Sequence, residues 1–284
     1  MRHAILGSGG IGGLLGGALA RSGADVVLLL RPKALARYTG RLAVESAVLG
    51  DFDVEVRGAP LLEGPVDVVW VATKATQLDA ALTLAPVDKV GEAVVIPLLN
   101  GVDHVALLRS RYREVVAGAI RVESERLSPT LIRQSSPFLR VELAGAEAVQ
   151  AELRRAGIQC DARDDELSLL WDKLAFLAPI ALATSALDAS IGAARDDPRF
   201  RGCREEALAV ASAEGARVNG DALRKLQEGA PASMRSSMQK DLAAGREPEL
   251  DAIAGPILRG GQKHSLTTES TQQLADQVRA RSAG

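Results

Sequence analysis

Close to the start of the chain, residues 4–12 read Ala-Ile-Leu-Gly-Ser-Gly-Gly-Ile-Gly. Three apolar residues suited to a short buried strand lead into a Gly-x-Gly-x-x-Gly loop, and residues 11–22 continue with the pattern of a helix. Residues 25–30 form a second apolar run, typical of a strand that is buried on both faces. A strand, a glycine loop, a helix and a second strand within about 30 residues indicate a dinucleotide-binding unit.

The glycines of this loop have separate expected uses. We expect Gly7 to allow the tight turn, Gly9 to let the backbone approach a pyrophosphate, and Gly12 to allow close packing of helix on strand. The free N–H groups at the helix N-terminus would then face the phosphates. The residues expected to bind the cofactor here are Gly7, Ser8, Gly9, Gly10, Ile11 and Gly12. The alternative is a glycine-rich turn that serves helix packing alone.

The residue that follows the second strand chooses between the two nicotinamide cofactors. An NAD site needs an acidic residue there for the ribose 2′-hydroxyl, whereas an arginine suits the 2′-phosphate of NADP. Here the residue is Arg31, with Lys33 and Arg37 nearby and no acidic residue. We therefore expect NADP(H), with Arg31 as a cofactor ligand; the alternative is an exposed loop arginine.

The rest of the chain divides into two parts that differ in the pattern of their apolar residues. Up to about residue 164, apolar strand-like runs alternate with helical stretches, which predicts a parallel α/β sheet. The further expected strands are 53–57, 66–72, 93–97, 115–118 and an antiparallel edge at 136–143, followed by a helix at 147–156. Beyond the charged residues 161–166, apolar residues recur at helical spacing. Helices are expected at 166–186, with a kink at Pro179, and at 199–217, 221–229, 233–244, 249–264 and 268–281. The prediction is an N-terminal Rossmann-like domain (1–164) followed by an all-helical C-terminal domain (165–284).

Composition excludes several classes of protein. The chain has 284 residues, 47% of them hydrophobic and 25% charged, which is ordinary for a folded soluble protein. A formal charge of −2 argues against nucleic-acid binding, and two cysteines argue against a disulfide scaffold and favour the cytoplasm. Residues 4–20 superficially resemble a secretory signal, but glycines weaken an apolar helix. No other stretch reaches the ~20 apolar residues of a membrane span, so no membrane association is expected.

The absence of several known catalytic motifs excludes some types of dehydrogenase. A Tyr-x-x-x-Lys pair is absent, because Tyr38 is followed four residues on by Leu42 and Tyr112 by Val116. The three histidines lack the neighbours of a zinc site, so no metal is expected. A reductase with this sequence would therefore take its proton donor from a lysine or a carboxylic acid.

Five motifs, in order along nearly the whole chain, resemble the ketopantoate reductase (2-dehydropantoate 2-reductase) family. They are the glycine loop with Arg31, Thr73-Lys74-Ala75-Thr76-Gln77, Leu99-Asn100-Gly101-Val102, Trp171-Asp172-Lys173-Leu174, and Ser236 to Asp241 with Glu249-Leu250-Asp251. The resemblance implies NADPH-dependent reduction of ketopantoate to pantoate, a step of pantothenate biosynthesis. It also implies that the helical domain could support a homodimer.

The resemblance implies a role for each matching residue. Lys173 resembles the general acid that protonates the carbonyl oxygen in the cleft between the domains, and Glu249 the catalytic carboxylate that works with it. Ser237 resembles the residue that binds the substrate carboxylate. Asn100 resembles the amide that positions both nicotinamide and substrate, so it counts as a substrate and a cofactor residue.

Lys74 and Gln77 resemble residues on the cofactor side of the site. Lys74 also follows a predicted strand at the carboxyl edge, where open α/β sheets bind ligands. Each site residue has a structural alternative. Asn100-Gly101 is a turn signal, Lys173 could lie along the surface, and Ser237 and Glu249 could be helix-cap or solvated-face residues.

Two positions depart from the family. The helix that carries the catalytic lysine usually has asparagines four and eight residues later, and they hold the substrate. Here these positions are Leu177 and Ala181. We therefore expect either ketopantoate or a more apolar 2-oxo acid or ketone as the substrate. Two further hypotheses are a non-catalytic NADPH-binding regulator and a dehydrogenase that works mainly in the oxidative direction.

Overall fold

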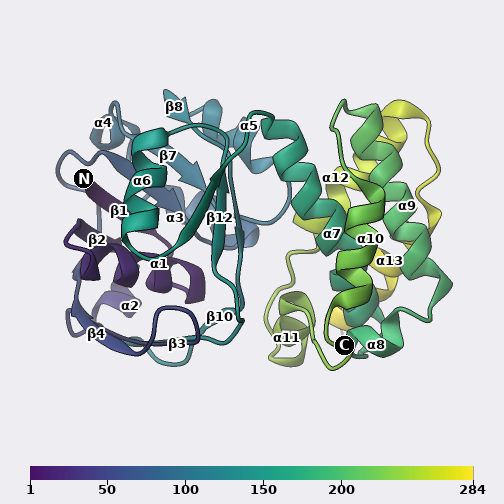
Figure 1. Cartoon of the computed structure of the whole chain (residues 1–284), viewed down its shortest axis with the longest axis horizontal. Coiled ribbons are helices and arrows are strands. Elements are labelled where there is room, and N and C mark those ends of the chain that lie inside the picture. Colours follow the sequence, from purple (N-terminus) through teal and green to yellow (C-terminus); the bar gives the residue numbers. More distant parts are fainter. Residues whose placement is uncertain (284) are drawn as a thin grey trace. The chain divides into compact units, whose positions relative to one another are not determined.

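The computed structural model describes residues 1–283 and separates into two compact units. The first unit comprises residues 1–99 and 104–166, and the second comprises residues 100–103 and the chain from Leu167 onward. The first unit holds all the strands of the described chain, and the second is built of helices (Figure 1). The predicted fold class, a Rossmann-like α/β domain followed by a helical domain, is confirmed.

The centre of the first unit is a fully parallel six-stranded sheet in the order β5-β2-β1-β6-β7-β8. Its strands are β1 (Arg2–Leu6), β2 (Asp25–Leu29), β5 (Arg57–Ala59), β6 (Val68–Val71), β7 (Val94–Pro97) and β8 (Glu114–Val115). Ile5 of β1 stands between Leu28 and Trp70 of the neighbouring strands, and all three side chains are fully buried. Burial on both faces explains why the four inner strands, β2, β1, β6 and β7, are mostly apolar, whereas the edge strands β5 and β8 are short and carry Arg57 and Glu114.

Helix α1 (Gly10–Arg21) packs between this sheet and a second one of four strands. The second sheet has the order β10-β11-β3-β4, formed by β10 (Ser124–Arg126), β11 (Leu131–Gln134), β3 (Arg41–Ser46) and β4 (Phe52–Glu55). A Cβ on Gly16 would lie 3.0 Å from Leu28, whereas one on Gly13 would lie 2.5 Å from Ile132. The glycines of α1 therefore allow close approach of a sheet on each side of the helix.

A third sheet completes the first unit and corrects two expectations. Its order is β13-β12-β9, formed by β13 (Gln159–Ala162), β12 (Arg140–Leu143) and β9 (Gly118–Arg121). The stretch expected as an edge at 136–143 contains β12, which is the middle strand because it pairs on both sides. The expected strand at 115–118 is divided between β8 and β9, which belong to different sheets.

The helices of the first unit are short apart from α1 and α6. They are α2 (Pro32–Leu35), the 3-10 helix η1 (Ala75–Gln77), α3 (Leu78–Leu82), α4 (Val87–Val90), α5 (His104–Arg109) and α6 (Glu147–Arg155).

The second unit is built from helices around one apolar core. They are α7 (Glu166–Leu187), α8 (Ile191–Ala194), α9 (Pro198–Ala213), α10 (Gly220–Gly229), α11 (Ser237–Ala243), α12 (Leu250–His264) and α13 (Glu269–Ala283). Helix α9 ends four residues earlier than expected, because Gly215 adopts a left-handed backbone with φ of +93°. Helices α9, α12 and α13 pack on one another.

Helix α7 remains a single helix through Pro179. It is long and apolar enough to cross a membrane by length and composition, contrary to the expectation of no such stretch, but 78% of its apolar window is buried inside the protein. A core helix meets the same criteria, and α7 supplies core residues such as Leu174 and Leu182.

Candidate functional site

The glycine loop joins β1 to α1 at the carboxyl edge of the parallel sheet. Gly7 has a φ of +99°, and a Cβ there would lie 2.8 Å from the backbone nitrogen of Thr73. A Cβ on Gly12 would lie 1.9 Å from the carbonyl oxygen of Gly7. Neither position accepts a side chain, because the obstacle in each case includes backbone.

Gly9 differs from these two positions. It is the N-cap residue of α1, and a Cβ placed on it would meet nothing within 4 Å. The first turn of α1 carries no acidic residue, so its N–H groups and positive dipole end face no carboxylate of their own. Nearby, the hydroxyl oxygen of Thr73 is buried without a hydrogen-bond partner in residues 1–283. Open space, free backbone donors and an unpaired polar atom fit the phosphates of a dinucleotide.

Arg126, which was not predicted from the sequence, contacts this loop and lies near two other arginines, Arg31 and Arg37. The Nη1 of Arg126, on β10, donates to the hydroxyl of Ser8 at 3.3 Å. Partial burial and then the charges of Arg31 and Arg37 lower the pKa of Arg126 below its ordinary value. A guanidinium stays charged at neutral pH in spite of such a shift, so three positive charges gather at the end of β2.

Arg126 was missed because no local pattern reveals it. It stands 118 residues from Ser8 along the chain, and only the pairing of β10 with β11 brings it to the loop. The contact is close, since the hydroxyl of Ser124 donates to the Gly10 carbonyl at 3.0 Å. A Cβ on Gly10 would lie 2.2 Å from the Ser124 carbonyl oxygen.

Lys74 and Gln77 lie after β6, at the same edge of the sheet. Lys74 is half-buried and precedes the short helix η1, whereas Gln77 is exposed at the end of η1. Gly7 contacts Thr73, so the loops after β1 and β6 lie against each other. Lys74 is the residue after Thr73 and therefore lies next to the glycine loop.

The second unit brings together Asn100 and Glu249. The side-chain nitrogen of Asn100 donates to Glu249 Oε2 at 3.2 Å. Gly101 has a φ of +88°, and a Cβ there would lie 2.4 Å from the carbonyl oxygen of Ala252 in the first turn of α12. The turn that Asn100-Gly101 was expected to form therefore seats the amide against the start of α12. Glu249 occupies the N-cap position of α12 but makes no side-chain cap hydrogen bond.

Lys173 lies on α7 and is nearly buried, with 8% of its surface exposed, the same fraction as Glu249. One turn and two turns further along the same helix face stand Leu177 and Ala181. Leu177 is half-buried and packs against the helical core, and Ala181 is fully buried within that core. The two positions that depart from the family thus carry apolar contacts.

Ser237 is the first residue of α11, and its side chain is exposed. Of the two structural alternatives for Ser237, the helix cap is wrong, because the cap is Ser236, whereas a position on the solvated face agrees with the exposed side chain. The Ser236 hydroxyl accepts from the Gln239 backbone N–H at 3.1 Å and is hydrogen-bonded to the Thr184 hydroxyl at 2.7 Å. Ser236 thereby fixes the start of α11 against α7 and leaves the Ser237 hydroxyl out of the cap.

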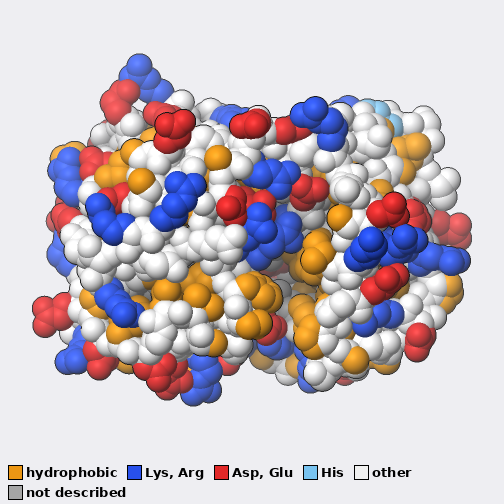
Figure 2. Space-filling model, in the orientation of Figure 1, with side chains coloured by type: hydrophobic (Ala, Val, Ile, Leu, Met, Phe, Trp, Pro, Cys, Tyr) orange, Lys and Arg blue, Asp and Glu red, His pale blue; other side chains and the backbone are white. Residues whose placement is uncertain are grey.

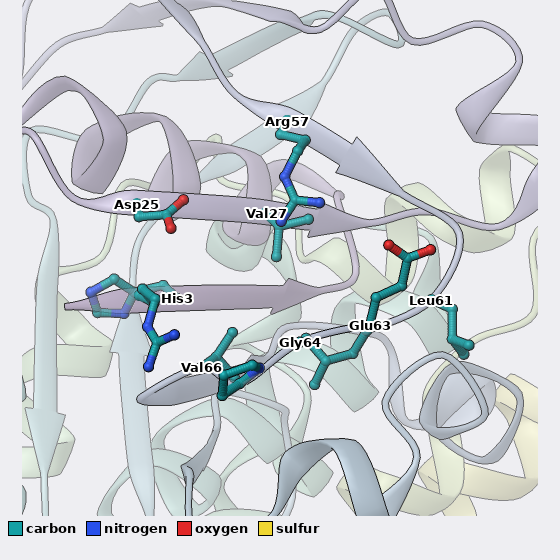
Figure 3. Close-up of a pocket in the computed structure, with 11 residues that line it drawn as sticks. His3, Asp25, Val27, Arg57, Leu61, Glu63, Gly64 and Val66 are labelled. Carbon is teal, nitrogen blue, oxygen red and sulfur yellow. The ribbon is translucent and has the colours of Figure 1, made fainter.

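A cavity of about 300 Å³ in the first unit lies away from the glycine loop (Figure 3). His3, Asp25 and Arg57 line it at or near the amino ends of their parallel strands, whereas the glycine loop follows the carboxyl end of β1. Ligands of open α/β sheets bind at the carboxyl edge, so we do not assign the cofactor to this cavity. Within residues 1–283, no group of three or more His, Cys, Asp or Glu side chains is arranged to hold a metal ion.

Comparison with known proteins identifies the family. The model for ketopantoate reductase PanE/ApbA matches residues 3–146, and the model for the C-terminal part of ketopantoate reductase PanE/ApbA matches residues 166–282. The chain belongs to the ketopantoate reductase family. It is 30% identical over 295 residues to a 2-dehydropantoate 2-reductase of Mycobacterium tuberculosis, covering 99% of this chain and 98% of the relative.

Other relatives agree with this assignment. A 2-dehydropantoate 2-reductase of Caulobacter vibrioides is 29% identical over 284 residues, covering 95% of this chain and 96% of the relative. The crystal structure of a PanE/ApbA family ketopantoate reductase from Ralstonia eutropha has a TM-score of 0.88 and 28% identity, covering 100% of this chain and 99% of that one. The family resemblance read from the five motifs is confirmed, and the family is one of oxidoreductases.

Proposed function

We propose that this protein is an NADPH-dependent reductase that converts a 2-oxo acid to the corresponding 2-hydroxy acid. The first unit binds the cofactor and the helical unit binds the substrate. The observation that carries the proposal is the nearly buried Lys173 in a ketopantoate reductase chain that also retains the Asn100–Glu249 pair. A protein that only sensed NADPH would need no proton donor.

The residues of the chain have the following proposed roles. NADPH, when bound, supplies the hydride that the keto carbon accepts. Lys173 gives a proton to the carbonyl oxygen, so that the oxygen becomes a hydroxyl as the carbon is reduced. Glu249 accepts a hydrogen bond from that hydroxyl, and the amide of Asn100, bonded to Glu249, holds the carboxylate in position. The exposed hydroxyl of Ser237 binds the substrate carboxylate.

The choice of NADPH over NADH rests on the arginines at the glycine loop. Arg31 follows β2, where the ribose 2′ position of a bound dinucleotide lies in this fold. Arg37 and Arg126 add two more positive charges, and Arg126 is held by Ser8. Within residues 1–283, none of the three arginines forms an ion pair with an acidic residue. Their positive charges therefore repel one another, and a bound phosphate dianion would relieve that repulsion.

A more apolar substrate than ketopantoate is a second candidate within the same reaction. Leu177 and Ala181 replace two amides that hold the substrate in the family, and both contact the apolar core. Each lost hydrogen bond to a polar substrate costs about 1–3 kcal/mol when the partner stays unsatisfied. A 2-oxo acid with a larger apolar side chain would lose less binding free energy than ketopantoate, because it would need fewer hydrogen bonds at these two positions.

The experiment is the rate of NADPH oxidation with ketopantoate and with a branched, more apolar 2-oxo acid. A high kcat/KM with ketopantoate would show that the reaction tolerates Leu177 and Ala181 in place of the family's asparagines. It would also assign the family reaction to this chain. Faster turnover of the apolar acid would assign the second candidate. Tight NADPH binding without turnover of either acid would contradict the reductase proposal and favour a regulatory role.

A further inference from the structure

The helical unit contains a cavity of about 250 Å³ that the proposed reductase reaction does not use. It is formed by the end of α8, the first two turns of α9 and the last turn of α10. Its lining residues are Arg195, Phe200, Arg201, Arg204, Gln227 and Glu228. None of them belongs to the residues proposed to bind NADPH or the 2-oxo acid.

Positive charge is in excess in this cavity, with three guanidinium groups against the single carboxylate of Glu228. Arg204 has 8% of its surface exposed, and its Nε and Nη2 both donate to one oxygen of the adjacent Glu205, at 3.2 and 3.1 Å. Arg201 is exposed and makes no ion pair within residues 1–283. Guanidinium groups bind carboxylates and phosphates through paired N–H donors, so the lining favours an oxyanion.

A buried donor in the lining lacks an acceptor. The Nε of Arg195 is buried and has no hydrogen-bond partner in residues 1–283, although the Nη2 of the same side chain donates to the Ala230 carbonyl. Buried polar atoms in proteins are nearly always hydrogen-bonded. An oxyanion in the cavity would supply the missing acceptor.

A buried acceptor in the lining lacks a donor. Gln227 is 1% exposed, and its Nε2 donates to the carbonyls of Ala175 and Phe176 at 3.2 and 3.0 Å. These two bonds fix which end of the amide is the nitrogen, and they leave Oε1 buried without a partner in residues 1–283. An oxyanion alone cannot donate to Oε1. A hydroxyl group on the ligand can, whereas an ammonium group would be repelled by the arginines.

We propose that this cavity binds a small oxyanion that also carries a hydroxyl group. The oxyanion pairs with Arg195, Arg201 and Arg204, and the hydroxyl donates to Gln227 Oε1. Hydroxy carboxylates and polyol phosphate esters share this chemistry. The site does not depend on the proposed reductase function.

Calorimetric titration of the full chain with glycolate and, separately, with glycerol phosphate tests the proposal. Acetate, which lacks the hydroxyl, is the control ligand. Arg201→Gln is the informative variant because the side chain is exposed and its removal leaves the helical core intact. Arg279→Gln, an exposed arginine of α13 outside the cavity, is the matched control.

We expect at least one of the two hydroxylated probes to bind, with a Kd about tenfold weaker in Arg201→Gln and unchanged in Arg279→Gln. Acetate should bind more weakly than glycolate. Binding of glycolate alone would identify a hydroxy carboxylate, and binding of glycerol phosphate alone a phosphate ester. Absence of binding by both probes at millimolar concentration would overturn the proposal. So would binding that Arg201→Gln leaves unchanged, or glycolate binding lost only in Lys173→Ala, which would assign the ligand to the reductase site.

Discussion

Lys173 is the residue on which the proposed reaction depends most. We expect Lys173→Ala to reduce kcat by about 10²–10⁴-fold, the usual contribution of a general acid, with little change in the Kd of NADPH. The measurement is steady-state turnover together with cofactor binding followed by fluorescence. Turnover near the wild-type rate in the variant would remove Lys173 from the role of proton donor.

Arg126 tests the cofactor preference at the residue scale. Arg126→Gln removes one of three neighbouring positive charges and the only one that is hydrogen-bonded to Ser8 within residues 1–283. We expect about tenfold weaker binding of 2′,5′-ADP, equivalent to losing one charge-assisted hydrogen bond. Binding of 5′-AMP, which lacks the 2′-phosphate, should change far less. Arg133→Gln is the matched control, because that arginine stands on the neighbouring strand β11 and pairs with Glu45. Equal losses for both nucleotides would contradict a 2′-phosphate contact.

His3 gives the first unit a pH dependence of stability. Its ring accepts from Trp70 Nε1 at 3.1 Å and bonds Glu152 Oε2 at 3.1 Å. Burial lowers the pKa of His3 below its ordinary value of 6.5, so the unfolded chain binds a proton there more readily than the folded one. The free energy of unfolding should therefore fall as the pH drops from about 7.5 to 5.5.

Denaturant titrations across that pH range check the effect, and His3→Gln should flatten the slope. Burial alone would raise the pKa of Glu152, but its hydrogen bond with His3 and the nearby positive charges outweigh burial and lower the pKa below 4.5. Glu152 therefore titrates outside the range used. An unchanged slope in His3→Gln would contradict the assignment of the effect to His3.

At the scale of the element, two glycines at the start of α1 have different expected roles: Gly12 serves packing and Gly9 serves cofactor binding. Gly12→Ala places a methyl group 1.9 Å from the Gly7 carbonyl oxygen, so the backbone must move. We expect a loss of about 2 kcal/mol or more in the free energy of unfolding. Gly9→Ala adds the same methyl group into open space and should leave stability nearly unchanged while weakening NADPH binding.

Chemical denaturation and cofactor titration of the two variants form a matched pair. If Gly9→Ala bound NADPH as tightly as the wild type, the pyrophosphate would not approach Gly9. If Gly12→Ala were as stable as the wild type, the loop would have an unstrained alternative path.

The elements could be predicted from the sequence where pattern and burial agree. The inner strands β1, β2, β6 and β7 are mostly apolar, and the longer helices of the second unit carry the helical period, so these elements were expected near their observed bounds. The single strand expected at 53–57 is instead divided between β4 and β5, which belong to different sheets. Strand β13 was missed because half of it lies in the charged stretch that begins at residue 161. The division of 115–118 between two sheets could not be predicted, because partner choice is a tertiary property that local pattern does not encode.

The candidate site shows the same division between local and long-range information. Motifs next to strands, such as the glycine loop and Lys74, reveal themselves because strand ends and loops are local. Arg126 carries no motif and reaches Ser8 only through the pairing of β10 and β11. The cap role of Ser236 rather than Ser237 was likewise invisible, because two adjacent serines differ only in backbone conformation.

At the scale of the whole molecule, charge is spread rather than concentrated. The face drawn in Figure 2 intermixes Lys and Arg with Asp and Glu, in keeping with the formal charge of −2. Against that background the three arginines at the glycine loop are a local feature, so cofactor binding should depend on salt through these few charges. Raising ionic strength should weaken NADPH more than NADH, because the additional phosphate carries the additional ion pairs.

Cofactor binding should also stabilise the fold, and the size of the effect separates NADPH from NADH. A ligand that binds only the folded chain at 100 times its Kd adds about 2.7 kcal/mol to the free energy of unfolding. At one fixed concentration, NADPH should therefore raise Tm more than NADH does. Because the three arginines proposed to bind the 2′-phosphate belong to the first unit, we expect Arg126→Gln to reduce the NADPH-induced rise in Tm, whereas Arg201→Gln in the helical unit should leave that rise unchanged. Equal shifts with NADPH and NADH in the wild-type protein would show that the arginines at the loop do not select the 2′-phosphate.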